Sequence, residues 1–240
     1  MSKNFKLFLG FTYLLLLAIF LYFIFSNIQI NRLNDFSYYK ELQQSLDNFV
    51  TSNLFINLTY FFIFAIIWVA LLGFGTPILI ISGILFGKWI GTIVSILSMS
   101  LGALALYSIA SFFFRDIVKK ILERKFQKYI QLFQKNEFYY FFIYRFVGGL
   151  GVPFFLQNVF PVLFNMKKIN YFFSSLLGFV PAFFVFNTVG AGLNNYVEKA
   201  ESFSFLELIL TSEIYLPIVM FITLMILSLI VKKKFFKNVN

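Results

Sequence analysis

Long apolar runs, separated by short polar stretches, dominate the pattern of hydrophobic and polar positions along the chain. A helix needs about 20 consecutive apolar residues to cross a bilayer core. Four runs meet this condition and predict spanning helices, at residues 7–26, 89–114, 168–193 and 214–231. The first run could also belong to a signal peptide, because Lys3 and Lys6 precede it. It is long and lacks a small-residue cleavage site, which favours a retained anchor.

Two shorter segments have one apolar and one polar face, which predicts helices at the membrane surface. In residues 32–49, the apolar positions Leu33, Phe36, Leu42, Leu46 and Phe49 fall near one helical face. Residues 115–136 combine a similar apolar face with seven Lys/Arg and two acidic residues. A basic amphipathic helix suits an anionic membrane surface, and the alternative is a solvated connector.

Two further apolar stretches, residues 53–88 and 137–166, are each broken by the pattern Gly-x-Gly-x-Pro. The breaks are GFGTP at residues 73–77 and GLGVP at residues 149–153, an offset of 76 residues. The same offset relates three further pairs, which are Ser98 and Ser174, Leu101 and Leu177, and Gly102 and Gly178. We interpret this as an internal repeat of a broken hairpin followed by a spanning helix.

The repeat predicts how the broken stretches sit in the membrane. By analogy with residues 137–148, the first arm of the first hairpin covers about residues 61–72. Twelve residues of helix rise about 18 Å, which is too short to cross a core of about 30 Å. Each break is then the tip of a re-entrant hairpin, and the two hairpins enter from opposite faces. A full crossing by residues 53–72 remains the alternative.

The distribution of charge predicts the orientation. In the hairpin topology, one side of the membrane carries 15 Lys/Arg and 3 acidic residues, and the other carries 4 and 7. The positive-inside rule therefore places both termini in the cytoplasm of a multi-pass protein of the inner membrane. A full crossing by residues 53–72 leaves the Lys/Arg balance unchanged, so these residues alone do not separate the two topologies.

Composition supports the membrane assignment and excludes several classes of function. Hydrophobic residues make up 60% of the chain and charged residues 12%, against about 25% charged in soluble domains. The chain has no Cys and no His, which removes disulfides, thiol nucleophiles, imidazole bases and the usual zinc sites. No acidic residues cluster inside the apolar runs, so we expect no enzyme and no cofactor. The net charge of +10 comes from basic flanks of apolar segments, so we expect no nucleic-acid partner.

The breaks and their surroundings resemble a known family. The stretch GFGTPILIISGILFGKWIGTIVSILSMSLGALALYSIASFFFRD resembles the first motif of the DedA/VTT superfamily, the SNARE-associated membrane proteins. The stretch YRFVGGLGVPFFLQN resembles its second motif, in which Arg145, Pro153, Phe154 and Asn158 occupy the matching positions. Gly148 and Gly149 look like an insertion. The chain lacks the acids of the family's first hairpin and its second Arg, which argues against proton coupling through a membrane carboxylate.

The resemblance covers about residues 50–193 and implies a division of the chain. Residues 1–52 form an N-terminal anchor and interfacial helix, and residues 53–193 form the DedA/VTT-like domain. Within that domain, repeat 1 covers about 53–114, the connector 115–136, and repeat 2 about 137–193. Residues 194–240 form a connector, a spanning helix and a basic tail. The resemblance also implies lipid handling, as in phospholipid scrambling or the recycling of undecaprenyl phosphate and other lipid carriers.

The breaks themselves suggest an anion site. Proline is tolerated in the first helical turn, so Pro77 and Pro153 are expected to open the second arm of each hairpin. The preceding glycines, Gly75, Gly149 and Gly151 among them, permit the tight backbone that a reversal needs. Two helix N-termini would then point into the membrane with free N–H groups, an arrangement that suits a phosphate or carboxylate. The alternative is that both breaks are architectural bends.

Arg145 is the one charged residue well inside an apolar segment. A charge at that depth costs at least about 2.5 kcal/mol and usually faces a cavity or a partner. We expect Arg145 to meet an anionic head group, with polar contacts from Gln157, Asn158 and Asn187. The structural alternatives are an ion pair with Glu137 or a side chain that reaches the cytoplasmic interface.

These observations predict an all-α integral membrane protein with about four spanning helices and two opposed re-entrant hairpins that form an inverted repeat. The function expected is translocation or scrambling of an anionic lipid, either a phospholipid or a polyprenyl phosphate. The substrate-binding residues would be Arg145, Gly75, Pro77, Gly149, Gly151, Pro153 and Asn158. Transport of a small anion or other solute is one alternative, and a non-transporting scaffold that docks through residues 115–136 is another. Membrane lipids are the expected partners, and a homo-oligomer stays open.

Overall fold

The computed structural model describes residues 3–26, 32 and 35–235, without the side chains of residues 72, 114–130, 132 and 150 and some of those near the two ends. Every regular element in the described ranges is a helix. The first half of the chain contains α1 (Lys3–Ser26), α2 (Phe36–Ser52), α3 (Leu54–Leu72) and α4 (Thr76–Lys135). The second half contains α5 (Glu137–Phe146), η2 (Gly148–Gly151), α6 (Phe154–Val159), η3 (Phe160–Phe164), α7 (Lys168–Gly178), α8 (Val180–Lys199), α9 (Phe205–Leu210) and α10 (Ser212–Phe235). The all-helical prediction is confirmed for this part of the chain.

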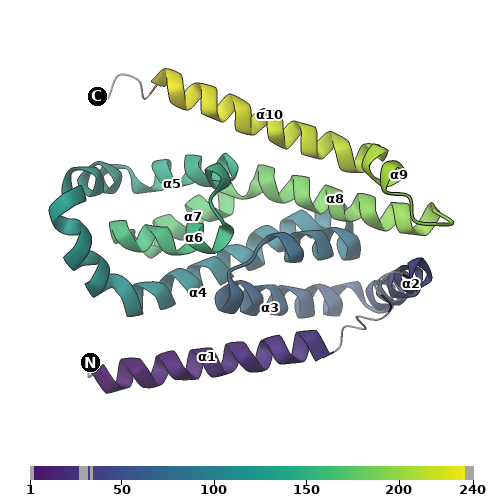
Figure 1. Ribbon diagram of the computed structural model, residues 1–240, viewed down its shortest axis with the longest axis horizontal. Helices are drawn as coiled ribbons and strands as arrows, with labels where there is room; N and C mark the ends of the chain where they lie inside the picture. The colour runs from purple at the N-terminus through teal and green to yellow at the C-terminus, as the bar shows by residue number, and fades with distance from the viewer. Residues whose placement is uncertain (1–2, 27–31, 33–34, 236–240) are drawn as a thin grey trace.

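The first half of the chain reverses its direction twice in quick succession (Figure 1). Helix α3 runs from the end of the molecule near α2 and stops near its middle, where residues 73–75 turn the chain back. The first segment of α4, residues 76–86, returns toward α2 and ends at Gly87, whose φ of 70° and ψ of 179° are not helical. Ser82 Oγ then donates to the carbonyl of Gly91, so the segments on either side of Gly87 lie side by side.

The second half of the chain repeats this course from the opposite end (Figure 1). Helix α5 runs inward and ends at residue 146, and residues 147–153 turn the chain back into α6 and η3. A left-handed residue, Asn165, ends η3, and α7 with α8 then runs the length of the molecule with a 47° bend at Phe179. Helix α10 returns, so its C-terminal end lies at the same end of the molecule as the start of α1.

Two helices of the described residues are long and apolar enough to cross a membrane, Leu54–Leu71 and Thr76–Phe113, and the second of these contains the break at Gly87. The bent pair α7 and α8 adds a third if it forms one span. Helices α1 and α10 contribute shorter apolar stretches, Phe8–Phe23 and Ser212–Thr223. These helices support a membrane protein, and the number of four spans stays a prediction.

Helix α3 differs from the short arm that the repeat suggested. It has 19 residues and begins at Leu54, so the expected boundary near residue 61 is wrong. The extra turns are apolar, and Asn53 caps them by accepting a hydrogen bond from the backbone N–H of Ile56. A helix of this length reaches about 28 Å, so its length no longer argues against a crossing.

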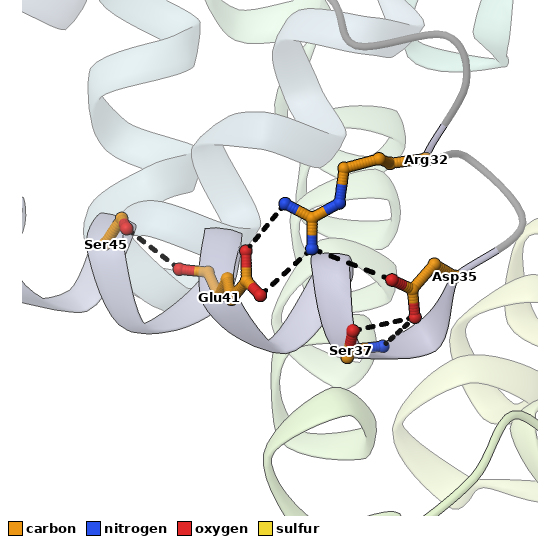
Figure 2. Close-up of polar contacts among 5 residues, drawn as sticks. All are labelled: Arg32, Asp35, Ser37, Glu41 and Ser45. Carbon is orange, nitrogen blue, oxygen red and sulfur yellow. Dashed lines mark hydrogen bonds and ion pairs between the residues drawn. The ribbon is translucent and has the colours of Figure 1, made fainter.

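Helix α2 covers most of the segment 32–49 that was predicted to be helical, and it has a well-defined start (Figure 2). Its position at the membrane surface stays a prediction. Asp35 is its N-cap and accepts hydrogen bonds from the backbone N–H and hydroxyl of Ser37. These bonds, with a smaller contribution from Arg32, lower the pKa of the Asp35 carboxyl. The cap therefore stabilises α2 fully above the ordinary pKa of 3.8, and this contribution is lost as the pH falls through the lowered value. Arg32 also forms a two-pronged, solvent-exposed ion pair with Glu41.

The basic segment 115–136 does not form a separate helix. Its backbone continues α4 as far as Lys135, and the ribbon curves around the end of the molecule before α5 begins (Figure 1). Most of the predicted apolar and basic faces lie outside the described side chains. Phe133, at the end of the apolar face, is described and stacks on Phe164 at 4.3 Å. Placement of this segment on a membrane surface stays a prediction.

Candidate functional site

The tips of the two helical reversals contact each other near the middle of the molecule. A Cβ atom built on Gly73 would lie 2.8 Å from the ring of Phe155, and one on Gly75 would lie 3.1 Å from the ring of Phe154. The glycine backbone of the first tip therefore packs against aromatic rings that follow about 80 positions later in the sequence, at the second tip. The two Gly-x-Gly-x-Pro breaks, which are related by sequence pattern, are also neighbours in space.

The first tip is built largely as its sequence suggests. Gly73 has a φ of 68°, which favours glycine, and Pro77 lies in the first turn of α4, as predicted. Gly75 has an ordinary right-handed φ of −98°, so its predicted backbone role is wrong. Its lack of a side chain serves the close approach of Phe154 instead. Trp68 Nε1 donates to the carbonyl of Phe74, and the hydroxyl of Tyr13 donates to that of Leu71, so these two backbone oxygens near the tip are satisfied.

The second tip differs from the first in how the helix that follows it begins. Gly149 and Gly151 both have positive φ, as the turn prediction requires. Pro153 precedes α6 as its N-cap rather than lying inside its first turn. Helix α6 has only six residues before the chain tightens into η3, so it carries a smaller dipole than the predicted second arm. Gly149 instead makes room for the side-chain amide of Gln157.

Arg145 of α5 lies at the centre of a closed polar network behind the second tip. Its side chain is 1% exposed. One terminal nitrogen donates to Gln157 Oε1 at 3.1 Å, and the other donates to Asn158 Oδ1 at 2.6 Å and to the hydroxyl of Tyr171 at 3.0 Å. Gln157 and Asn158, which were expected to contact a head group beside Arg145, here accept hydrogen bonds from Arg145 itself. Their contact with a head group stays a prediction. All three acceptors are neutral.

Aromatic rings surround the remaining faces of the guanidinium. The carbon Cζ of Arg145 lies 4.7 Å from the ring centres of both Phe141 and Phe179. The rings of Phe154 and Tyr171 lie at 5.6 and 5.7 Å. Such contacts stabilise a cation through the negative ring faces without neutralising its charge. The cage therefore holds Arg145 in place and leaves its full positive charge in an apolar interior.

Arg145 forms no ion pair within the described part of the chain. Glu137 accepts instead from the backbone N–H of Lys167 and the side-chain amide of Asn170, which rules out the proposed pair in this state. Complete burial likewise rules out a side chain that reaches the interface. Two donors in the network, Arg145 Nε and Asn158 Nδ2, are buried without any acceptor. The network thus has a surplus of positive charge and of hydrogen-bond donors.

The aromatic partners of Arg145 were not predicted from the sequence. Phe141 precedes it by four residues and so shares its helix face, a signal that was present in the sequence. Tyr171 lies 26 positions away, and only the packing of α7 against α5 brings it close. Tyr171 also stacks on Tyr107 of α4 at 4.5 Å, and the hydroxyl of Tyr107 donates to the carbonyl of Met166. The network therefore connects the second reversal to the long helix of the first half.

Asn187 lies apart from this network. Its side-chain nitrogen donates to the carbonyl of Phe183 one turn earlier, and its Oδ1 lies over Gly91 of α4. Its predicted contribution to the anion site is therefore wrong. Asn187 belongs to the contact between α4 and α8.

The two repeats also share a packing contact at the offset of 76 residues. A Cβ atom on Gly102 would lie 2.8 Å from the carbonyl oxygen of Ile66 and 2.8 Å from Val69 Cβ. One on Gly178 would lie 3.1 Å from the carbonyl oxygen of Phe142 and 2.4 Å from Arg145 Cβ. The contacted residues are also 76 positions apart, Ile66 with Phe142 and Val69 with Arg145. Equivalent glycines therefore pack against equivalent positions in the first arm of each reversal. Val69 occupies the place of Arg145 in the first repeat.

These features define a helical membrane protein with two broken helix pairs and a buried, uncompensated arginine in the second pair. The family model of the VTT domain matches residues 72–192, which is half of the chain and includes both tips and Arg145. The chain therefore belongs to the VTT-domain family of membrane proteins. No solved structure matches it. Among the described residues, no group of three or more acidic side chains could hold a metal ion.

Proposed function

We propose that this protein translocates or scrambles an anionic lipid, a phospholipid or a polyprenyl phosphate, across the inner membrane, and that Arg145 binds its phosphate. The observation that carries the proposal is the fully buried charge of Arg145, which has neutral acceptors only. A buried cation without a counter-ion attracts an anion strongly, and the unpartnered Nε and Asn158 Nδ2 supply further donors.

The proposed topology has two re-entrant hairpins that enter from opposite faces and form an inverted repeat. The opposed chain directions and the shared contacts of Gly102 and Gly178 support it (Figure 1). Non-helical backbone at membrane depth is tolerated where protein buries it or where it lines a cavity, and both tips meet this condition. Both termini then lie in the cytoplasm, together with the basic segment 115–136.

Binding of a lipid head group requires the tips to separate, because Arg145 is closed off in this state. The tips touch through glycine backbones and the rings of Phe154 and Phe155, without a direct hydrogen bond between them among the described residues. A contact of this kind separates without breaking an ion pair. Opening toward one face and then the other would expose Arg145 alternately to each leaflet.

Reconstitution in liposomes tests the proposal. Vesicles with the purified protein are loaded separately with a labelled anionic phospholipid, a labelled polyprenyl phosphate, or inorganic phosphate as a small anion. We expect at least one of the two lipids to move faster than in protein-free vesicles. Movement of phosphate alone would replace the lipid proposal with the small-anion alternative. Movement of none, with circular dichroism that shows a folded protein, would overturn transport and favour a scaffold.

The topology predicts labelling from opposite sides of the membrane. The natural chain has no Cys, so single cysteines give an unambiguous signal. Gln44→Cys on α2 is exposed and should react with a membrane-impermeant maleimide on intact spheroplasts. Asn136→Cys is also exposed, lies at the other end of the molecule, and should react only after permeabilisation. Reaction of both variants from the same side would be incompatible with the hairpin topology.

A further inference from the structure

A half-open apolar cavity lies beside α2, far from Arg145. Its volume is about 570 Å³, within the range of ligand pockets. Helix α2 supplies five lining residues, and α4, α8, α9 and the loop before α9 close the other sides. The lining is mainly aromatic and aliphatic and includes Phe36, Leu42, Leu46, Leu193, Phe203 and Leu208. The apolar face of α2, which the sequence assigned to the membrane surface, therefore faces a space between helices.

A second cavity, polar and of about 310 Å³, adjoins the first. The two cavities share Tyr196, whose hydroxyl is fixed by the backbone N–H of Ser204 at 2.7 Å. Lys199, Glu207 and Glu213 line the second cavity, which gives it one positive and two negative side chains. Glu213 lies before the predicted span 214–231, and hydrogen bonds from its own backbone N–H and from Ser212 lower its pKa. Its carboxylate is thus charged at neutral pH.

We propose that these adjoining cavities bind one zwitterionic phospholipid with a primary ammonium head group. An acyl chain fills the apolar cavity, the ammonium faces Glu207 and Glu213, and the phosphate faces Lys199. This combination of an acidic pair and a single cation disfavours a phospholipid whose head group is only anionic. Arg145 lines neither cavity, so this site is separate from the proposed transport site and does not depend on it. The bound lipid stays in place and joins α2 and α9 to α8.

Native mass spectrometry of the full-length protein tests the head-group preference. The protein in detergent is mixed with equal amounts of phosphatidylethanolamine and phosphatidylglycerol, and the bound lipid is counted. We expect the ammonium lipid to be retained in preference by roughly tenfold or more. The double change Glu207→Gln with Glu213→Gln should remove most of that preference. Glu201→Gln is the matched control, because Glu201 is an exposed acid on the same connector that lines neither cavity.

A second pair of variants tests the acyl-chain cavity. Leu208→Trp places an indole in the apolar cavity and should remove the lipid adduct. Leu206→Trp changes the same helix at a position that is 69% exposed and should leave the adduct unchanged. Equal binding of both lipids by the wild-type protein would overturn the proposal. An intact adduct in Leu208→Trp, or its equal loss in Leu206→Trp, would overturn the placement of the chain.

Discussion

Replacing Arg145 with leucine is expected to stop lipid movement while the protein stays folded. The substitution leaves Gln157 Oε1 without the donor it has in Arg145, which costs about 1–3 kcal/mol, whereas Asn158 Oδ1 keeps the Tyr171 hydroxyl as a donor at 3.3 Å. It also removes a buried charge that costs about 2.5–3.5 kcal/mol at the centre of a membrane helix. These effects largely offset each other, so the melting temperature should change little. Lipid flux should fall by roughly tenfold or more, because the anion loses its buried charged partner.

Asn158→Asp separates the anion-binding role from a purely structural role. The change alters few atoms and places a carboxylate at the position that accepts from Arg145 at 2.6 Å. If Arg145 served only to hold α5 and α6 together, an ion pair there would preserve both stability and transport. If Arg145 binds the substrate phosphate, the new carboxylate neutralises it and transport should stop in a stable protein. Asn48→Asp, at an exposed position of α2, is the control for an added acid.

Flux in liposomes and thermal unfolding in detergent together decide this prediction. Transport at the wild-type rate by both Arg145→Leu and Asn158→Asp would remove Arg145 from the substrate site. Arg145→Lys tests an intermediate case for lipid flux, because lysine keeps the charge but cannot form the forked contacts with Gln157 and Asn158. We expect this variant to retain a reduced flux.

The sequence predicts those parts of the fold whose cause is local. Apolar run length predicts the helices, and the glycine and proline pattern predicts the reversals at residues 73–77 and 149–153. The charge of Arg145 inside an apolar run was enough to identify the centre of the polar network. Asn158 followed from its place in a motif. Each of these signals arises from residues within one or two turns of the position concerned.

Features that depend on packing between distant segments were not predictable. Tyr171 reaches Arg145 only because α7 packs on α5. Glu137 accepts a hydrogen bond from the backbone N–H of Lys167 at the start of α7 and does not pair with Arg145. The boundary between the broken stretch 53–88 and the span 89–114 predicted a reversal close to Gly87, and the structure places the break at this glycine. Its φ of 70° and ψ of 179° were not predictable, because a single glycine in an apolar run does not specify a backbone conformation. The close contact of the segments before and after Gly87 with α8 is what supports that conformation.

That contact leads to the prediction with the largest effect on stability, at Gly83. A Cβ atom there would lie 2.1 Å from the backbone oxygen of Asn187. Backbone cannot move aside as a flexible side chain can, so Gly83→Ala must push residues 76–86 away from α8. Overpacking costs about 1–3 kcal/mol, and a clash with backbone belongs at the upper end of that range or above it. We expect a melting temperature several degrees below wild type, or no folded protein.

Gly10→Ala is the matched control within a helix. Its Cβ atom would meet nothing closer than 3.9 Å, so the change should be neutral or stabilise α1 by up to about 1 kcal/mol. Gly190→Ala should reproduce the loss seen at Gly83, because its Cβ atom would lie 2.2 Å from the carbonyl oxygen of Ile80 on the facing helix.

The double variant of Gly83 and Gly190 tests whether both residues serve one interface. Once one added methyl group has separated the helices, the second has less to displace. The double variant should therefore lose less stability than the sum of the losses in the two single variants. Fluorescence of Trp68 and Trp89 during thermal unfolding in detergent measures all four variants. A stable Gly83→Ala protein would contradict the close packing of the first reversal on α8. Strict additivity would show that the two glycines act independently.

Since residues 76–86 form the second arm behind the GFGTP tip, a partly folded Gly83→Ala protein should also lose lipid flux, although Arg145 is unchanged.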